Sequence, residues 1–217
     1  SRDAMVDVTM YSAGGAYAGT EKQQICLSYA YGDGKESSCE NTVNSVQRLF
    51  YNIPINTYFS LDLDGIAALN DSIGGVDVVS PETIGDFVEG QSYHLVGQQA
   101  ESFVRTRDTS KVDSNNMRMQ RQKVYIQSFM NTVIQQTKKD LTTPLDLFNA
   151  SAPYSCTNLN PSKVTYLAQQ AVLGGMNGID MLSVPGQVKM GSKYAEFNVS
   201  EAEFYQMFLS IYYTKIE

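Results

Sequence analysis

The segment from Glu101 to Gln122, ESFVRTRDTSKVDSNNMRMQRQ, holds four of the six arginines in this 217-residue chain. The chain as a whole is acidic, with a formal net charge of −7 at pH 7. Guanidinium groups suit phosphate ligands, because the planar fork donates two parallel hydrogen bonds and stays charged at any working pH. Arginines concentrated in one part of an acidic protein therefore indicate a local site for an anion. These arginines are Arg105, Arg107, Arg118 and Arg121.

Helical spacing predicts how the second half of this segment is arranged. Residues 114–116 (Ser-Asn-Asn) offer helix N-cap side chains, and a long helix is predicted from Met117 to Gln136. Four side chains recur at i, i+3, i+4 and i+7, so they share one face of that helix. They are Arg118, Arg121, Gln122 and Tyr125.

Arg105 and Arg107 are two residues apart, and they point the same way only where the chain is extended. A preceding helix from Gly97 to about Val104 is therefore expected to end at this point. Asp113 stands just before the long helix, where its carboxylate can hold arginines in place or accept a proton from an attacking hydroxyl. The alternative is a solvated basic helix face with Asp113 as an ordinary ion-pair partner.

Several blocks of the sequence resemble one protein family, and they occur in the same order. The run FVRTR (103–107), then Asp113, then MRMQRQK (117–123) resembles the "YVRxR … D … R..RQ" signature of the LytR-CpsA-Psr family. Members of that family are cell-wall glycopolymer ligases of mainly Gram-positive bacteria. Residues 1–5 (SRDAM) resemble its "S-I-P-R-D" segment. The blocks at 27–32, 53–58 and 63–81 resemble its "AYxxGG", "IPIDxY" and "GGVxVxxP" blocks, so nearly the whole chain is covered.

The resemblance implies an α/β fold, a three-layer helix–sheet–helix sandwich around a mixed central β-sheet. It also implies a single catalytic domain over residues 1–217. The residues favour the same class, because strand, helix and strand follow one another between Thr57 and Val79, as in a helix-covered sheet.

The family's implied activity is a phosphotransfer. An anionic glycopolymer, such as teichoic acid or capsule, moves from a polyprenyl-pyrophosphate carrier to a sugar hydroxyl of peptidoglycan. Such a reaction needs cations over the pyrophosphate, because charge builds on the leaving phosphate. Carried over position by position, the resemblance assigns catalysis to Asp113 and Arg121. The side chains expected to bind the pyrophosphate are Arg2, Arg105, Arg107, Arg118 and Gln122, and Asp3 is expected to be structural, bonding the backbone or Arg2.

The sequence departs from the family pattern at its start. The family's "D-T-M" strand, which supplies the aspartates that bind Mg²⁺, precedes the segment matched by Arg2 and Asp3. Mg²⁺ is therefore expected from the family, with ligands upstream of residue 1, and no metal ligand is assigned here. The family's cytoplasmic tail and single membrane helix also lie upstream, which would place the domain at the outer face of the bacterial membrane.

Two other functions stay open at this point. One is a non-catalytic binder of pyrophosphate lipids or wall polyanions, and the other is the family's older label of transcriptional attenuator. A net negative charge and the lack of a basic helix-turn-helix disfavour nucleic-acid binding. A single histidine, His94, weakens any Ser-His-Asp or Cys-His scheme and is expected to be structural. Whether Cys26 and Cys39 form a disulfide is left open.

Periodicity predicts the remaining elements. Strands are expected at 5–10, 57–61, 76–79, 93–96, 179–184 and 194–199, and a glycine-rich loop at 12–19. A short helix is expected within 23–31, and further helices at about 37–50, 64–73, 145–150 and 160–173 and after Ser200. Apolar stripes at helical spacing include Val43, Val46, Leu49 and Phe50 in one helix, and Val164, Leu167, Ala168 and Val172 in another.

Overall fold

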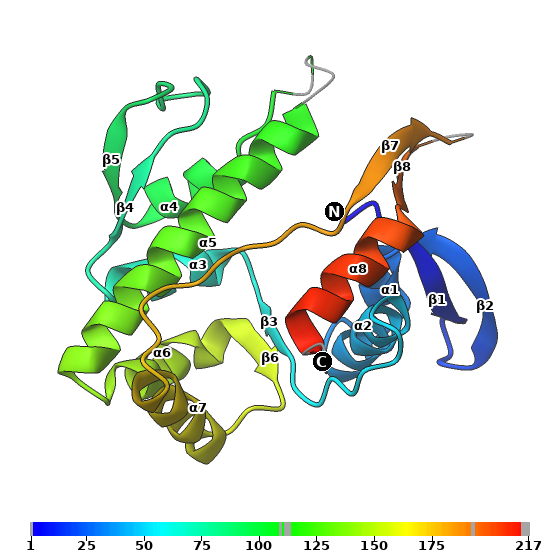
Figure 1. Cartoon of the computed structure of the whole chain (residues 1–217), viewed down its shortest axis with the longest axis horizontal. Helices are drawn as coiled ribbons and strands as arrows, with labels where there is room; N and C mark the ends of the chain where they lie inside the picture. Colours follow the sequence, from blue (N-terminus) through cyan, green and yellow to red (C-terminus); the bar gives the residue numbers. More distant parts are fainter. Residues whose placement is uncertain (1, 109, 111–113, 192–193, 214–217) are drawn as a thin grey trace, which may run out of the picture. The chain divides into compact units, whose positions relative to one another are not determined.

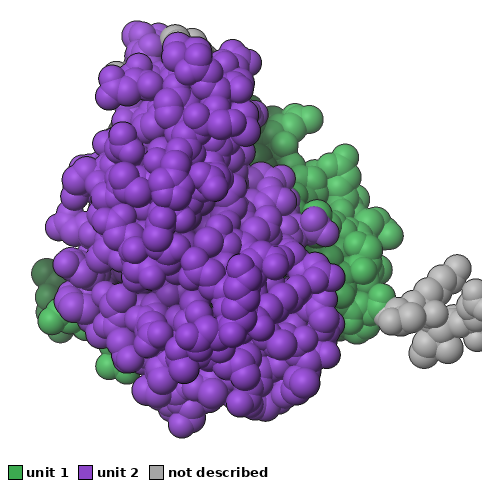
Figure 2. All heavy atoms as spheres, turned by 90° about the vertical axis from the view of Figure 1, so that its left-hand side faces the viewer, with its two compact units in different colours: residues 1–59, 156–158, 182–217 green, residues 60–155, 159–181 purple. Residues whose placement is uncertain are grey.

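The computed structural model describes residues 2–108, 110, 114–191 and 194–213. Helices and strands are mixed along the whole chain (Figure 1), so the predicted α/β class is confirmed. Residue contacts divide the chain into two compact units, which Figure 2 shows in different colours. Unit 1 comprises residues 1–59, 156–158 and 182–217, and unit 2 comprises residues 60–155 and 159–181.

The strands of unit 1 combine antiparallel and parallel pairing. β1 (Met5–Tyr11) pairs antiparallel with β2 (Tyr17–Gln24), and β7 (Gly186–Met190) pairs antiparallel with β8 (Ala195–Val199). A parallel bridge between Ala4 and Phe197 joins the two hairpins, and the Phe197 N–H donates to the Asp3 carbonyl at 2.8 Å. This mixed pairing agrees with the mixed sheet expected from the sequence. A short pair, β3 (Phe59–Leu61) with β6 (Ser155–Thr157), is separate from these hairpins.

Two helices follow the first hairpin, α1 (Leu27–Ala30) and α2 (Glu36–Leu49). Two α2 side chains bond carbonyls of β1: Arg48 donates to Asp7 at 3.1 Å and Asn41 donates to Thr9 at 2.9 Å. The predicted stripe of Val43, Val46, Leu49 and Phe50 is only half-buried. The fully buried side of α2 is formed instead by small or polar residues, because these let the helix approach and bond the strand. They are Ser38, Cys39, Asn41 and Ser45.

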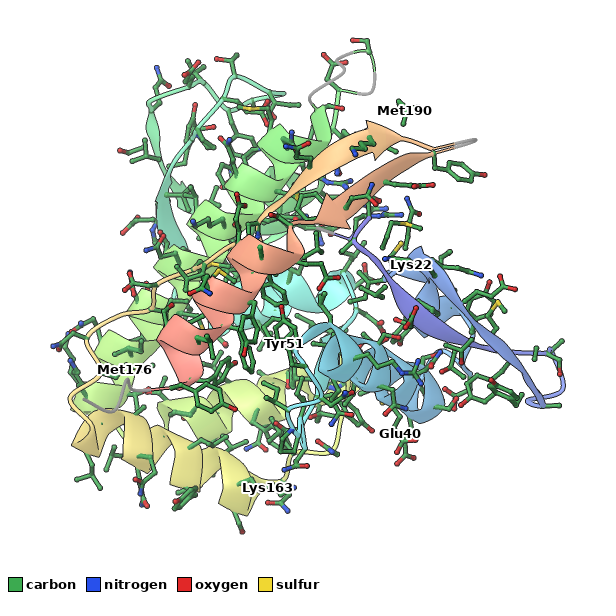
Figure 3. All side chains as sticks on the ribbon, turned by 45° about the vertical axis from the view of Figure 1, so that its right-hand side comes forward. Lys22, Glu40, Tyr51, Lys163, Met176 and Met190 are labelled. Atoms are coloured by element: carbon green, nitrogen blue, oxygen red, sulfur yellow. The ribbon has the colours of Figure 1, made fainter. Side chains whose placement is uncertain are left out.

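The last helix of unit 1, α8 (Glu201–Tyr212), packs through aromatic rings. Tyr51, labelled in Figure 3, stacks on Phe204 with ring centroids 5.6 Å apart and meets Phe208 edge-on at 4.9 Å. Phe204 and Phe208 are buried, as the predicted apolar side of this helix requires. Burying an aromatic side chain of this size contributes about 1.5–3 kcal/mol to folding, so these two rings anchor α8.

Unit 2 is built around the long helix α5 (Ser114–Lys139). Its apolar core holds side chains from α3 (Asp64–Ser72), the hairpin of β4 (Val76–Val79) and β5 (Ser92–Leu95), and α4 (Gln98–Arg105). α6 (Thr143–Ser151), the 3-10 turn Ala152–Tyr154 and α7 (Pro161–Leu173) complete the unit. Members of this core include Ile73, Val76, Leu95, Phe103 and Tyr125.

Three local predictions differ from the structure. The segment Tyr17–Gln24 is the strand β2, although a loop and the start of a helix were predicted over it. Residues 179–184 are not a strand, and the chain enters β7 only at Gly186. α7 forms where predicted, but none of its residues is fully buried, and Leu167 stays 54% exposed. Within the described ranges, no helix is both long and apolar enough to cross a membrane.

Candidate arginine site

The predicted anion site lies where α4 ends and α5 begins, inside unit 2. Arg105 is the last residue of α4, and its Nη1 donates to the Glu101 carboxylate at 2.7 Å, one helical turn back. The Arg105 side chain is 63% exposed. Arg107 is exposed in the following extended stretch, and its Nε donates to the Ser114 hydroxyl at 3.0 Å. Since Ser114 begins α5, this bond ties the two helix ends together.

Two further side chains of the predicted site, Arg118 and Gln122, lie on α5. Arg118 is half-buried and its Nη2 donates to the Asn115 side-chain oxygen at 2.8 Å. Gln122 is half-buried and its amide donates to the Val104 carbonyl at 3.1 Å. Gln122 thus faces α4, whereas the Arg118 bond stays within α5.

Arg121 differs from the other arginines of this region. It is 0% exposed, and its Nε makes a 2.7 Å ion pair with the Glu82 carboxylate. Its Nη1 donates to the Phe103 carbonyl at 2.5 Å, and its Nη2 donates to the Thr106 carbonyl. Arg121, to which the resemblance assigned a catalytic role, is therefore fully buried. The cause is Glu82, which supplies a buried counter-charge from the loop after β4.

Two further residues named from the sequence are Arg2 and Asp113. Arg2 belongs to unit 1, where it is exposed and its Nε lies 3.5 Å from the Asp3 carboxylate. This contact is one of the two that were expected of Asp3, which was predicted to bond the backbone or Arg2. Asp113, the predicted base, lies outside the described residues. Within unit 2, the structure thus places Arg105, Arg107, Arg118 and Arg121 at or near one pair of helix ends.

Sequence reasoning missed three residues that organise the site. Glu101 could have been found, because an acid four residues before Arg105 on a helix is a recognised pairing. Ser114 was recognised as a cap residue and not as a partner of Arg107. Glu82 gives no such signal, because 39 residues separate it from Arg121. Its pairing depends on the tertiary fold.

Comparisons with known proteins identify the family. The sequence matches the LytR_cpsA_psr family over residues 1–210, so the chain belongs to that family. A relative from Bacillus cereus is named polyisoprenyl-teichoic acid–peptidoglycan teichoic acid transferase TagU. It is 28% identical over 173 residues, which are 76% of this chain and 52% of the relative. The chain spans between 28% and 52% of the length of the curated relatives it matches.

Solved structures confirm the fold. B. subtilis TagV superposes with a TM-score of 0.68 at 22% identity, covering 99% of this chain and 82% of TagV. A structure of TagT bound to LI-WTA superposes with a TM-score of 0.66 at 17% identity, covering 97% of this chain and 74% of TagT. Identities this low show the shared fold alone.

Proposed function

We propose that this chain forms the pyrophosphate-binding and transfer domain of a glycopolymer phosphotransferase. The substrate would be an anionic glycopolymer, such as teichoic acid or capsule, on a polyprenyl-pyrophosphate carrier, and the acceptor would be a peptidoglycan hydroxyl. The observation that carries the proposal is the grouping of Arg105, Arg107 and Arg118 at two helix ends that are tied together. Family membership and the name of the TagU relative support it.

The proposed reaction transfers a phosphoryl group from a diphosphate to a hydroxyl. The acceptor hydroxyl oxygen attacks the phosphorus next to the glycan, the bridging P–O bond breaks, and polyprenyl phosphate leaves. Negative charge grows on the leaving phosphate, so guanidinium groups aimed there lower the barrier. We propose that Arg2, Arg105, Arg107, Arg118 and Gln122 bind the diphosphate and that Asp113 accepts the hydroxyl proton. The resemblance also assigned catalysis to Arg121, but its burial favours a positioning role in which it does not touch the substrate.

Mg²⁺ belongs to the proposal as the family's expected cofactor. Within the described residues, no group of three or more His, Cys, Asp or Glu side chains is placed to hold a metal ion. The described residues alone therefore do not form a site for the metal. We further propose that the domain works at the outer face of the bacterial membrane, held there by a membrane helix preceding this sequence.

A transfer assay tests the proposal and separates it from its alternative. Whole protein is incubated with radiolabelled polyprenyl-pyrophosphate glycan and peptidoglycan fragments, with and without Mg²⁺. Label is expected in peptidoglycan, together with free polyprenyl phosphate, and Arg105→Ala with Arg107→Ala should slow transfer at least about a hundredfold. Substrate that is retained without turnover would indicate a non-catalytic binder. Equal rates for the double variant and the wild type would contradict the proposed site.

A further inference from the structure

A buried ion pair links two segments of unit 2 that are far apart in the sequence. Glu82 Oε1 and Arg121 Nε are 2.7 Å apart, with side chains that are 11% and 1% exposed. Charged groups lose hydration when they are buried, so such a pair persists only where its remaining donors and acceptors are also bonded. The contacts of Arg121 therefore indicate what the pair does.

Both terminal nitrogens of Arg121 bond the chain around Arg105. Nη1 donates to Phe103 at 2.5 Å, and Nη2 donates to the Thr106 carbonyl. Gln122, the next residue on α5, donates to Val104 at 3.1 Å. The last carbonyls of a helix have no partner within the helix, and here α5 side chains supply partners for Phe103 and Val104.

We infer that Arg121 and Glu82 are positioning residues for the diphosphate site and do not touch the ligand. The pair holds residues 103–106, so that Arg105 and Arg107 leave the end of α4 in a fixed direction. Every nitrogen of the Arg121 guanidinium is bonded within the protein, and the residue is 0% exposed. This inference rests on the proposed function and deepens it by adding Glu82 to the site.

The inference can be tested by whether removing the charge of Glu82 strengthens or weakens diphosphate binding. A carboxylate near a bound diphosphate repels it, so removing that charge should tighten binding if Glu82 is only a neighbour of the site. If Glu82 positions Arg121, and Arg121 in turn holds Arg105 and Arg107, the same removal should weaken binding. Glu82→Gln keeps the shape of the side chain and removes only its charge.

The experiment measures binding of geranyl diphosphate to the 217-residue chain by titration calorimetry. Glu82→Gln and Arg121→Lys are each expected to weaken binding about tenfold. Arg121→Lys retains the positive charge but loses the planar fork that reaches two carbonyls at once. The matched control is Gln136→Ala, also on α5, which loses a 2.7 Å bond to the Ile73 carbonyl at the end of α3. It should bind the probe like the wild type.

Hydrogen exchange of the amides at 103–107 is the second readout, and it should accelerate in Glu82→Gln but not in Gln136→Ala. If the folded Glu82→Gln protein binds equally well or more tightly, the inference is overturned. The inference is also overturned if near-UV circular dichroism shows that neither Glu82→Gln nor Arg121→Lys folds. The ion pair would then be needed for folding and not for positioning Arg105 and Arg107. A wild type that does not bind the probe would instead count against the proposed function, and exchange at 103–107 would still decide the positioning role.

Discussion

Arg118 and Arg121 lie three residues apart on α5, yet their guanidinium groups have different surroundings. Arg118 is half-buried and bonds Asn115 on its own helix, whereas Arg121 is fully buried against Glu82 and two carbonyls. Helical spacing correctly predicted that both lie on one face. It could not predict which one is buried, because the deciding partner, Glu82, comes from another part of the chain.

His94 is exposed, and its ion pair makes the stability of the folded state depend on pH. Its Nδ1 lies 2.8 Å from the Asp77 carboxylate, and its Nε2 lies 3.0 Å from the Gly74 carbonyl. The hydrogen bond to Asp77 raises the pKa of His94 above its ordinary value of 6.5. A group with a raised pKa stabilises the folded state fully below its unfolded pKa, and this contribution is lost as pH rises through the folded pKa.

We therefore predict that Asp77→Asn lowers the melting temperature at about pH 5.5 and lowers it less at about pH 8.5. The His94 titration midpoint, followed by NMR, should fall toward about 6.5 in this variant. The control is Asp86→Asn, which removes another exposed acid of the same unit. It should leave the melting temperature and the His94 titration midpoint unchanged. A melting-temperature difference that stays constant between the two pH values would contradict the assignment.

Helices with clear apolar periodicity and sharp end signals were predictable from the sequence. The helix predicted at about 64–73 is α3, which ends at Ser72 just before the positive-φ pair Gly74 and Gly75. Residues 114–116, predicted to cap the long helix, are instead the first residues of α5. β2 was missed because its residues, YAGTEKQQ, are mostly polar and none is fully buried, so they show no alternation of apolar and polar positions. Its pairing is determined by β1, which lies across the hairpin, and not by its own side chains.

The end of α3 supports a prediction about two adjacent glycines. Gly74 and Gly75 both have positive φ, +82° and +93°. A Cβ on Gly74 would meet nothing within 4 Å, whereas one on Gly75 would lie 2.5 Å from the His94 ring and 2.8 Å from the Leu95 carbonyl. Gly74→Ala should therefore cost about 1–2 kcal/mol from backbone strain alone, and Gly75→Ala about 1–3 kcal/mol more from the clash. Urea unfolding measures both, and equal losses of stability would contradict this account.

At the scale of the whole molecule, the family match covers residues 1–210 and so draws on both compact units. Charge and composition indicated only that the arginine segment binds an anion. The order of the sequence blocks indicated the family, and the family resemblance implied a diphosphate ligand. It also added Arg2 from unit 1 to the arginines of unit 2 that are expected to bind this ligand. No local pattern links position 2 with positions 105–118, so their shared role rests on the family resemblance and stays a proposal.

We propose that the guanidinium groups of Arg2 and of the 105–118 segment bind one diphosphate. The most direct measurement is the dissociation constant of geranyl diphosphate for Arg2→Ala, for Arg105→Ala with Arg107→Ala, and for a control of equal charge. That control, Lys138→Ala with Lys139→Ala, changes exposed cations in the last turn of the same α5 helix. Each lost charged hydrogen bond costs about 1.5–3 kcal/mol, so affinity should fall about tenfold or more for Arg2→Ala. The arginine double variant should lose about a hundredfold or more, and the control less than about twofold. Equal losses for the control and the arginine variants would contradict the claim.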